Sequence, residues 1–152
     1  QENLTAEEWN AIVGSDGTNL RANVDDGAVT VDGKLAYDVA DMHAGEAPNI
    51  VDVAYTNSVG KPEKTAMYDI DATIGGLIQQ APPNDGVLKA IGKLGVTGSD
   101  TFALDISATA DLQNTAWLIA GKTLHTVDLT TGAATSVGDI EGEALRDIAI
   151  LP

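Results

Sequence analysis

The chain has 152 residues, the length of one domain, and 43% of them are hydrophobic while only 4% are aromatic. Its 23 acidic and 8 basic residues give a net charge of −15, which argues against binding nucleic acid or an anionic membrane through a basic surface. The chain has no cysteine, which excludes disulfides, thiolate nucleophiles and cysteine-ligated metals. No apolar run reaches the roughly 18 residues of a membrane helix, so we expect no membrane insertion.

The first predicted element is a short N-terminal helix. Thr5 and Glu8 have the spacing of a capping box, in which each side chain bonds the other residue's backbone. The turn cluster at residues 14–17 ends any such helix. Because the first residue is Gln1, two interpretations stay open, a mature protein that has lost an export signal and a trimmed chain. We expect the first, and with it a bacterial protein that is periplasmic, secreted or at the cell surface.

The rest of the chain has the pattern of β-strands. Short runs of apolar and β-branched residues, several of them alternating with period two, lie between clusters of Gly, Asp, Asn and Pro. The clearest predicted strands are residues 49–56, 65–71, 101–106, 115–120, 123–129 and 147–151.

A weak internal repeat supports this pattern. Segments that begin at Met67 and Leu124 each have an aliphatic residue at position +3, Asp at +4 and Gly at +8. A third copy, which begins at Leu20, is degenerate because its Gly comes one position early. Asp and Gly are turn residues, so each copy predicts a strand, a turn and an antiparallel strand. The starts lie 47 and 57 residues apart, which suits one four-stranded unit per copy, as in propeller blades.

Several sequence blocks together resemble a known family. They are NLR at 19–21 with DGAV at 26–29, AYTNS at 54–58, PPNDG at 82–86 and VDLTTGAA at 127–134. From about residue 10 to its C-terminus the chain is similar to a bacterial, usually exported family of β-propeller-like domains of unknown function. The resemblance implies the fold and export, and it supplies no catalytic residues.

These observations predict an all-β protein built from antiparallel, propeller-like blades. We expect about two to three four-stranded units that form an incomplete ring within one domain. The expected boundaries are an N-terminal segment at 1–14 and units at about 15–48, 49–98 and 99–152. So few blades leave faces and edges that natural proteins cover or pair. The alternative is a compact, monomeric β-sandwich or barrel.

The predicted function is therefore association without catalysis. We expect an exported subunit that forms a homo-oligomer or is an accessory subunit of a larger protein. The two ends of the unclosed array supply the candidate interface residues, which are Leu4, Trp9, Ile12, Val13, Ile148, Ile150 and Leu151. The alternative is that the N-terminal segment docks on its own domain.

The second hypothesis is a ligand- or metal-binding module, with calcium as the cation. Asp41, His43 and Glu46 share one loop, and Asp69 and Asp71 point to the same face of a predicted strand. Calcium prefers such oxygen ligands, but no Asp-rich segment matches an EF-hand loop. The alternative is that these carboxylates cap turns and solvate the surface.

The third hypothesis is a secreted hydrolase. No G-x-S-x-G motif is present, and the two histidines, His43 and His125, would have to act as bases across space. Paired carboxylates leave glycoside hydrolysis open, although the few aromatic residues offer little surface for stacking sugars.

Overall fold

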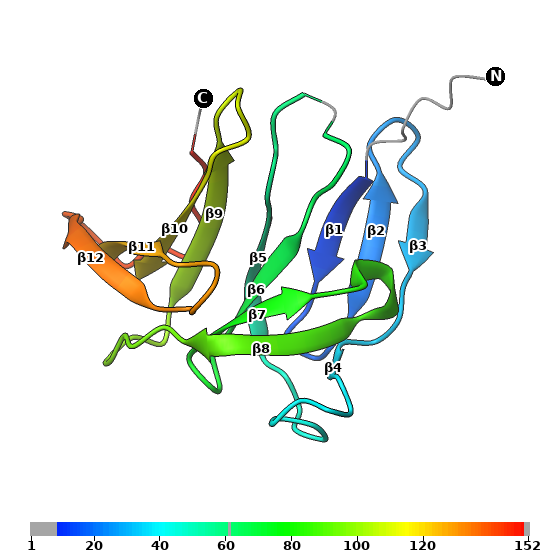
Figure 1. The fold of residues 1–152 in the computed structure, drawn as a ribbon, viewed down its shortest axis with the longest axis horizontal. Coiled ribbons are helices and arrows are strands. Elements are labelled where there is room, and N and C mark those ends of the chain that lie inside the picture. The colour runs from blue at the N-terminus through cyan, green and yellow to red at the C-terminus, as the bar shows by residue number, and fades with distance from the viewer. Residues whose placement is uncertain (1–8, 61, 151–152) are drawn as a thin grey trace.

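The computed structural model describes residues 9–60 and 62–150, which fold into three open β-sheets (Figure 1). Within these ranges the only helical turn is a 3-10 turn at Pro83–Asp85. The all-β prediction is thus confirmed for the described residues, and no sheet formed by them closes into a barrel. These residues contain no helix that is long and apolar enough to cross a membrane.

Each sheet is built on a meander of consecutive antiparallel strands, and Figure 1 shows one sheet on each side of a central one. The N-terminal sheet consists of β1 (Trp9–Val13), β2 (Asn19–Asn23) and β3 (Val29–Val31). The central sheet consists of β5 (Ile50–Tyr55), β6 (Met67–Asp71), β7 (Gly76–Gln80) and β8 (Val87–Lys93), with β4 (Ala36–Tyr37) added parallel to β8. The C-terminal sheet consists of β9 (Phe102–Ala108), β10 (Asn114–Ala120), β11 (Thr123–Val127) and β12 (Ala134–Asp139).

The hairpins of the sequence repeat are present. Asp71 and Asp128 each accept hydrogen bonds at Oδ1 from the N–H groups two and three positions on, at 2.7–3.4 Å. Four positions after each Asp, Gly75 and Gly132 adopt φ angles of +58° and +80°, which favour glycine. Local turn chemistry therefore connects β6 to β7 and β11 to β12.

The third copy uses the same turn with a different residue. Asn23 Oδ1 accepts the N–H groups of Asp25 at 2.8 Å and Asp26 at 3.4 Å, and Gly27 follows four positions after Asn23 with φ +74°. Asn23 thus stands where Asp71 and Asp128 stand in the other copies. The structural copy begins one residue earlier than the sequence comparison placed it, so its glycine is in register.

Five of the six clearest predicted strands are confirmed, as β5, β6, β9, β10 and β11. The sixth is wrong within the described residues, because 147–150 form no strand. The backbone N–H of Ile150 donates instead to Asp105 Oδ2 at 2.6 Å. A side chain of β9 therefore holds this C-terminal segment, and no strand pairs with it.

The predicted N-terminal helix is wrong where the structure describes it. Residues 9–13 form β1, paired in antiparallel register with β2 from Trp9 opposite Asn23 to Val13 opposite Asn19. Pairing with a neighbouring strand outweighs the local helix signal here. The capping-box residues Thr5 and Glu8 lie outside the described residues.

Two apolar clusters hold the three sheets together. The larger lies between the central and C-terminal sheets and includes Ile70, Leu77, Leu104 and Leu118, all nearly inaccessible to solvent. The smaller lies on the opposite side of the central sheet and is formed by Leu35, Tyr37, Ile50, Ile78 and Leu88, with Val13 of β1 packed against it. The central sheet is therefore covered on both faces.

Close backbone contact joins the central and C-terminal sheets at one edge. The N–H of Ala134 donates to the carbonyl oxygen of Leu94 at 2.9 Å. A Cβ on Gly92 would overlap the carbonyl oxygen of Thr131, so only glycine fits this approach.

Candidate functional site

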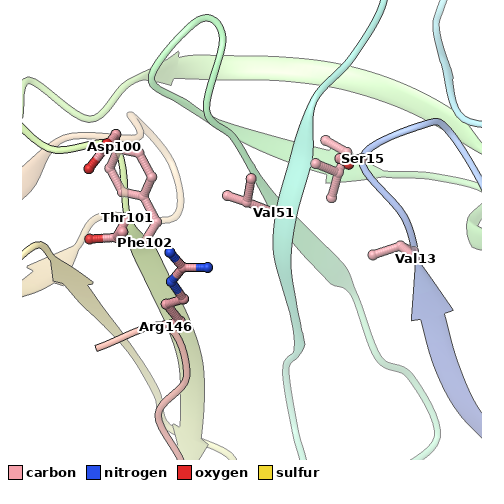
Figure 2. A pocket seen from close by; sticks show the side chains of 8 residues that line it. Val13, Ser15, Val51, Asp100, Thr101, Phe102 and Arg146 are labelled. Atoms are coloured by element: carbon pink, nitrogen blue, oxygen red, sulfur yellow. The ribbon is translucent and has the colours of Figure 1, made fainter. Parts of the chain in front are cut away.

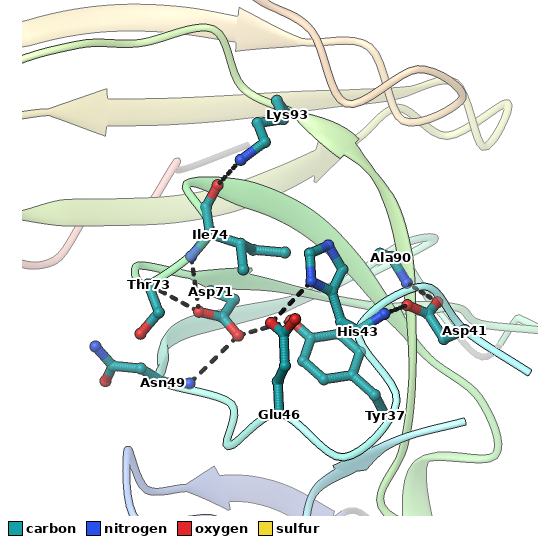
Figure 3. Close-up of polar contacts among 10 residues, drawn as sticks. All are labelled: Tyr37, Asp41, His43, Glu46, Asn49, Asp71, Thr73, Ile74, Ala90 and Lys93. Atoms are coloured by element: carbon teal, nitrogen blue, oxygen red, sulfur yellow. Dashed lines mark hydrogen bonds and ion pairs between the residues drawn. The ribbon is translucent and has the colours of Figure 1, made fainter. Parts of the chain in front are cut away.

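The loop between β4 and β5 holds three of the predicted metal ligands (Figure 3). His43 Nδ1 lies 2.9 Å from Glu46 Oε2, and the His43 ring lies against the ring of Tyr37, with centroids 5.3 Å apart. Asp41 has other partners, since its carboxylate accepts the N–H groups of His43 at 2.9 Å and Ala90 at 2.8 Å. Asp41 thus anchors the loop to β8, while His43 and Glu46 pair with each other.

Asp71 is a buried structural acceptor. Its Oδ2 accepts the hydroxyl of Tyr37 at 2.7 Å and the N–H of Asn49 at 3.3 Å, while its Oδ1 serves the β6–β7 turn (Figure 3). Burial and the hydrogen bond to Asp71 raise the pKa of Tyr37, so the phenol stays a donor. The carboxylate of Asp71 therefore ties β4, the long loop and the turn together.

Asp69 lies on the same face of β6 as Asp71 but has a different environment. Its side chain is 0% exposed, and neither of its carboxyl oxygens has a hydrogen-bond partner among the described residues. The same holds for Oε1 of Gln80, on the neighbouring strand β7. Desolvation raises the pKa of Asp69 to about 8, so its carboxyl is mostly protonated at neutral pH. A protonated acid is a poor ligand for calcium.

The predicted metal ligands do not form one cluster. Among residues 9–60 and 62–150, no group of three or more His, Asp or Glu side chains is arranged to hold a metal ion. Asp41, His43 and Glu46 share a loop, and Asp69 and Asp71 share a strand face, but each has the separate surroundings described above. The calcium hypothesis stays a prediction.

The predicted N-terminal interface residues divide between the two faces of β1. Ile12 is 47% exposed and points away from the central sheet. Val13 points the other way and packs against the smaller apolar cluster. Trp9 begins β1, and Leu4 lies outside the described residues.

The predicted C-terminal interface residues lie in the segment that is held by β9. Ile148 is partly buried and Ile150 is 36% exposed, and Leu151 lies outside the described residues. Ala103 and Ile119, paired on β9 and β10, point away from the larger apolar cluster and are nevertheless buried. Figure 1 shows the C-terminal segment running beside these two strands.

The sequence analysis missed most of an exposed apolar surface on the N-terminal sheet. The strand register places five apolar residues on the face that points away from the central sheet. We call this the N-terminal apolar face; it consists of Ile12, Leu20, Ala22, Val29 and Val31. Val29 is 60% exposed and Val31 is 79% exposed. The alternation of valine and threonine at 29–31 was the available signal, because it indicates a strand with one apolar face.

A pocket of about 420 Å³ lies where parts of all three sheets meet (Figure 2). We call it the inter-sheet pocket; its lining is Val13, Ser15, Ile50, Val51, Asp100, Thr101, Phe102 and Arg146. Figure 2 shows the guanidinium of Arg146 turned toward the space between Phe102 and Val51. No sequence pattern indicates this site, since its residues come from four distant segments.

The fold and these surfaces define an all-β protein of packed antiparallel sheets. A family model described as a domain of unknown function (DUF4394) matches residues 9–149. The chain therefore belongs to this family, which agrees with the resemblance to a family of unknown function. No curated protein and no solved structure matches the chain significantly.

Proposed function

We propose that the protein is a non-enzymatic association module whose sheets are propeller-like blades of an incomplete ring. It works outside the bacterial cytoplasm, by pairing with a second copy of itself. The strand order supports the blade interpretation, because β5–β8 and β9–β12 are each a meander of four consecutive antiparallel strands, with β4 added beside β8 in the central sheet. Their first strands also lie side by side, where Asp52 Oδ2 of β5 accepts the N–H of Leu104 of β9 at 2.7 Å.

The N-terminal apolar face is the observation that carries this proposal. The central sheet is covered by the N-terminal sheet, and the C-terminal sheet is covered by the central sheet. The outer face of the N-terminal sheet has no cover from the described residues, although five of its side chains are apolar; Asn10, opposite Ala22, is a polar residue on the same face. A contiguous apolar sheet face of this kind favours contact with another protein surface.

A second copy of the chain fits this face better than a head-to-tail stack. The far side of the C-terminal sheet is where Asp105 holds the C-terminal segment, which carries Glu141, Glu143 and Asp147. A stack that joined this side to the N-terminal apolar face would place carboxylates against apolar side chains. In a two-fold arrangement the N-terminal apolar face of one copy packs against the same face of the other copy. None of the five residues of this face carries a charge.

The test is the mass of the protein in solution, measured by light scattering over a range of concentrations. We expect twice the chain mass of 15.6 kDa for the wild type. Val31→Lys should give a monomer, because it places a charge within the apolar contact. Val39→Lys is the matched control, since Val39 is 95% exposed but lies on the loop after β4, and it should stay dimeric.

Because the net charge is −15, the dependence of dimerisation on salt concentration is a second test. Repulsion between two acidic copies is screened by salt, so added salt should strengthen the dimer. A wild-type protein that stays monomeric at every concentration and salt level would contradict the proposal. So would a Val31→Lys variant as dimeric as the wild type.

A further inference from the structure

We propose that the inter-sheet pocket binds a small zwitterion with an apolar side chain, such as an apolar α-amino acid. This inference goes beyond association, because the pocket is complete within one chain and lies apart from the N-terminal apolar face. It rests on the pocket's size, on its apolar wall and on two opposite charges at its lining.

The pocket has the size and the wall of a small-molecule site. Its volume of about 420 Å³ falls within the usual range of roughly 300–1,000 Å³ for such sites. The apolar wall combines Val13 of β1, Ile50 and Val51 of β5, and Phe102 of β9. Ile50 and Phe102 are themselves buried in the protein, so this wall is held by the core.

Arg146 supplies a cation at the pocket. It is one of only 8 basic residues in the chain, and the described residues include no ion-pair or hydrogen-bond partner for its guanidinium. Its side chain points into the space beside Phe102 (Figure 2). A guanidinium presents parallel N–H donors that match the two oxygens of a carboxylate, so this side chain suits the carboxylate of a ligand.

Asp100 supplies the opposite charge. Its carboxylate also lacks an ion-pair partner among the described residues, and it forms no ion pair with Arg146 although both line the same pocket. A ligand with an ammonium group next to its carboxylate can therefore satisfy both residues at once. The hydroxyl groups of Ser15 and Thr101 at the lining add hydrogen-bonding capacity for such a ligand.

The charge pattern favours a zwitterion over simpler ligands. An inorganic anion such as phosphate would meet Arg146 but would be repelled by Asp100 and by the net charge of −15. A simple amine would meet Asp100 and leave Arg146 without an anion. Neither of these ligands would use the apolar wall of Val51 and Phe102.

The experiment compares three ligands that share the same isobutyl side chain, by NMR of the isotope-labelled protein. The probes are leucine, 4-methylpentanoate, which lacks the ammonium group, and 3-methylbutylamine, which lacks the carboxylate. We expect saturable shifts of the Val51, Thr101 and Phe102 amide signals with leucine, and affinities at least about tenfold lower for the other two probes. Equal affinity of 4-methylpentanoate and leucine would overturn the zwitterion assignment.

Single substitutions test whether leucine binds through the charged residues of the inter-sheet pocket. Arg146→Gln and Asp100→Asn should each weaken leucine binding at least about tenfold, since each removes one charge partner. Lys122→Gln is the matched control, because Lys122 is an exposed basic residue outside this pocket, and it should bind leucine as the wild type does. Val31→Lys should also bind leucine normally, which distinguishes failure of the association proposal from failure of this one. The absence of saturable shifts with leucine, or an unchanged affinity in both charge variants, would overturn the inference.

Discussion

The two contacts that the central sheet makes are built from different chemistry. Its contact with the C-terminal sheet is an apolar layer in which Ile70, Leu77 and Leu118 are fully buried. Its contact with the N-terminal sheet also buries the polar side chains of Asn19, Asp69 and Gln80. The first contact gains stability from close packing, whereas the second must recover the cost of desolvating polar groups.

The polar contact recovers part of this cost by holding a turn. Asn19 Nδ2 donates to the carbonyl oxygens of Gly33 at 3.1 Å and Pro83 at 2.9 Å, and Gln80 Nε2 donates to the same Pro83 oxygen at 2.7 Å. The 3-10 turn is thereby fixed against the N-terminal sheet. Asp69 receives no such compensation from the described residues, which makes this contact sensitive to pH.

The largest effect should come from the apolar contact. Leu118→Ala removes a fully buried side chain between the two sheets and should lower the free energy of unfolding by about 2–5 kcal/mol. Urea denaturation measures this change. Leu145→Ala makes the same substitution at a residue 39% exposed in the C-terminal segment, and it should change stability by less than about 0.5 kcal/mol. Similar losses for both variants would show that the contact is not a close-packed core.

The next effect concerns the polar contact and its dependence on pH. Folded Asp69 keeps its proton up to about pH 8, whereas in the unfolded chain an Asp ionises near pH 4. Unfolding between these values therefore releases a proton. The stability contributed by Asp69 is fully present below about pH 4, falls by up to about 1.4 kcal/mol per pH unit as the pH rises toward 8, and is constant above.

Asp69→Asn tests this titration, because the amide has the same shape and does not ionise in this range. Denaturation curves from pH 4 to 9 should show a smaller loss of stability with rising pH than in the wild type. Asp111→Asn is the control, since Asp111 is exposed and should leave the pH profile unchanged. Parallel profiles for the wild type and Asp69→Asn would contradict the raised pKa.

The fold was predictable from sequence where local chemistry determines it. The Asp and Gly of each repeat specify a hairpin turn within a few residues, so the β6–β7 and β11–β12 hairpins could be found. By contrast, β1 forms because it pairs with β2, and its local signal pointed to a helix. Residues 147–150 have the apolar pattern of a strand, but a side chain of β9 binds the segment at Ile150.

The candidate sites were less predictable, because most of their contacts are distant in sequence. His43 and Glu46 share one loop, which the sequence shows directly, and in the structure they pair with each other. Asp41 lies even closer to His43, yet its carboxylate also bonds Ala90, and no local pattern indicates that. Arg146 and Asp100 line one pocket only after the three sheets have packed.

The smallest effects on stability should come from two equivalent turns, the β6–β7 turn of the central sheet and the β11–β12 turn of the C-terminal sheet. Asp71 and Asp128 bond their turns in the same way, but Asp71 is buried and also accepts the hydroxyl of Tyr37, whereas Asp128 is exposed. Asp71→Ala should cost about 1–3 kcal/mol, because it leaves the Tyr37 hydroxyl without its acceptor. Asp128→Ala should cost less, since water can reach the N–H groups that it exposes.

A further variant isolates the buried bond from the turn. Tyr37→Phe removes the hydroxyl that Asp71→Ala leaves unpaired, so the double variant should be more stable than the sum of the two single losses implies. The free energies of unfolding of the four proteins, measured in urea, give this coupling directly. Equal losses for Asp71→Ala and Asp128→Ala, together with additive losses in the Tyr37→Phe background, would mean that turn chemistry alone accounts for Asp71. A positive coupling instead assigns the difference between the two turns to the buried hydrogen bond between Tyr37 of β4 and Asp71 of β6.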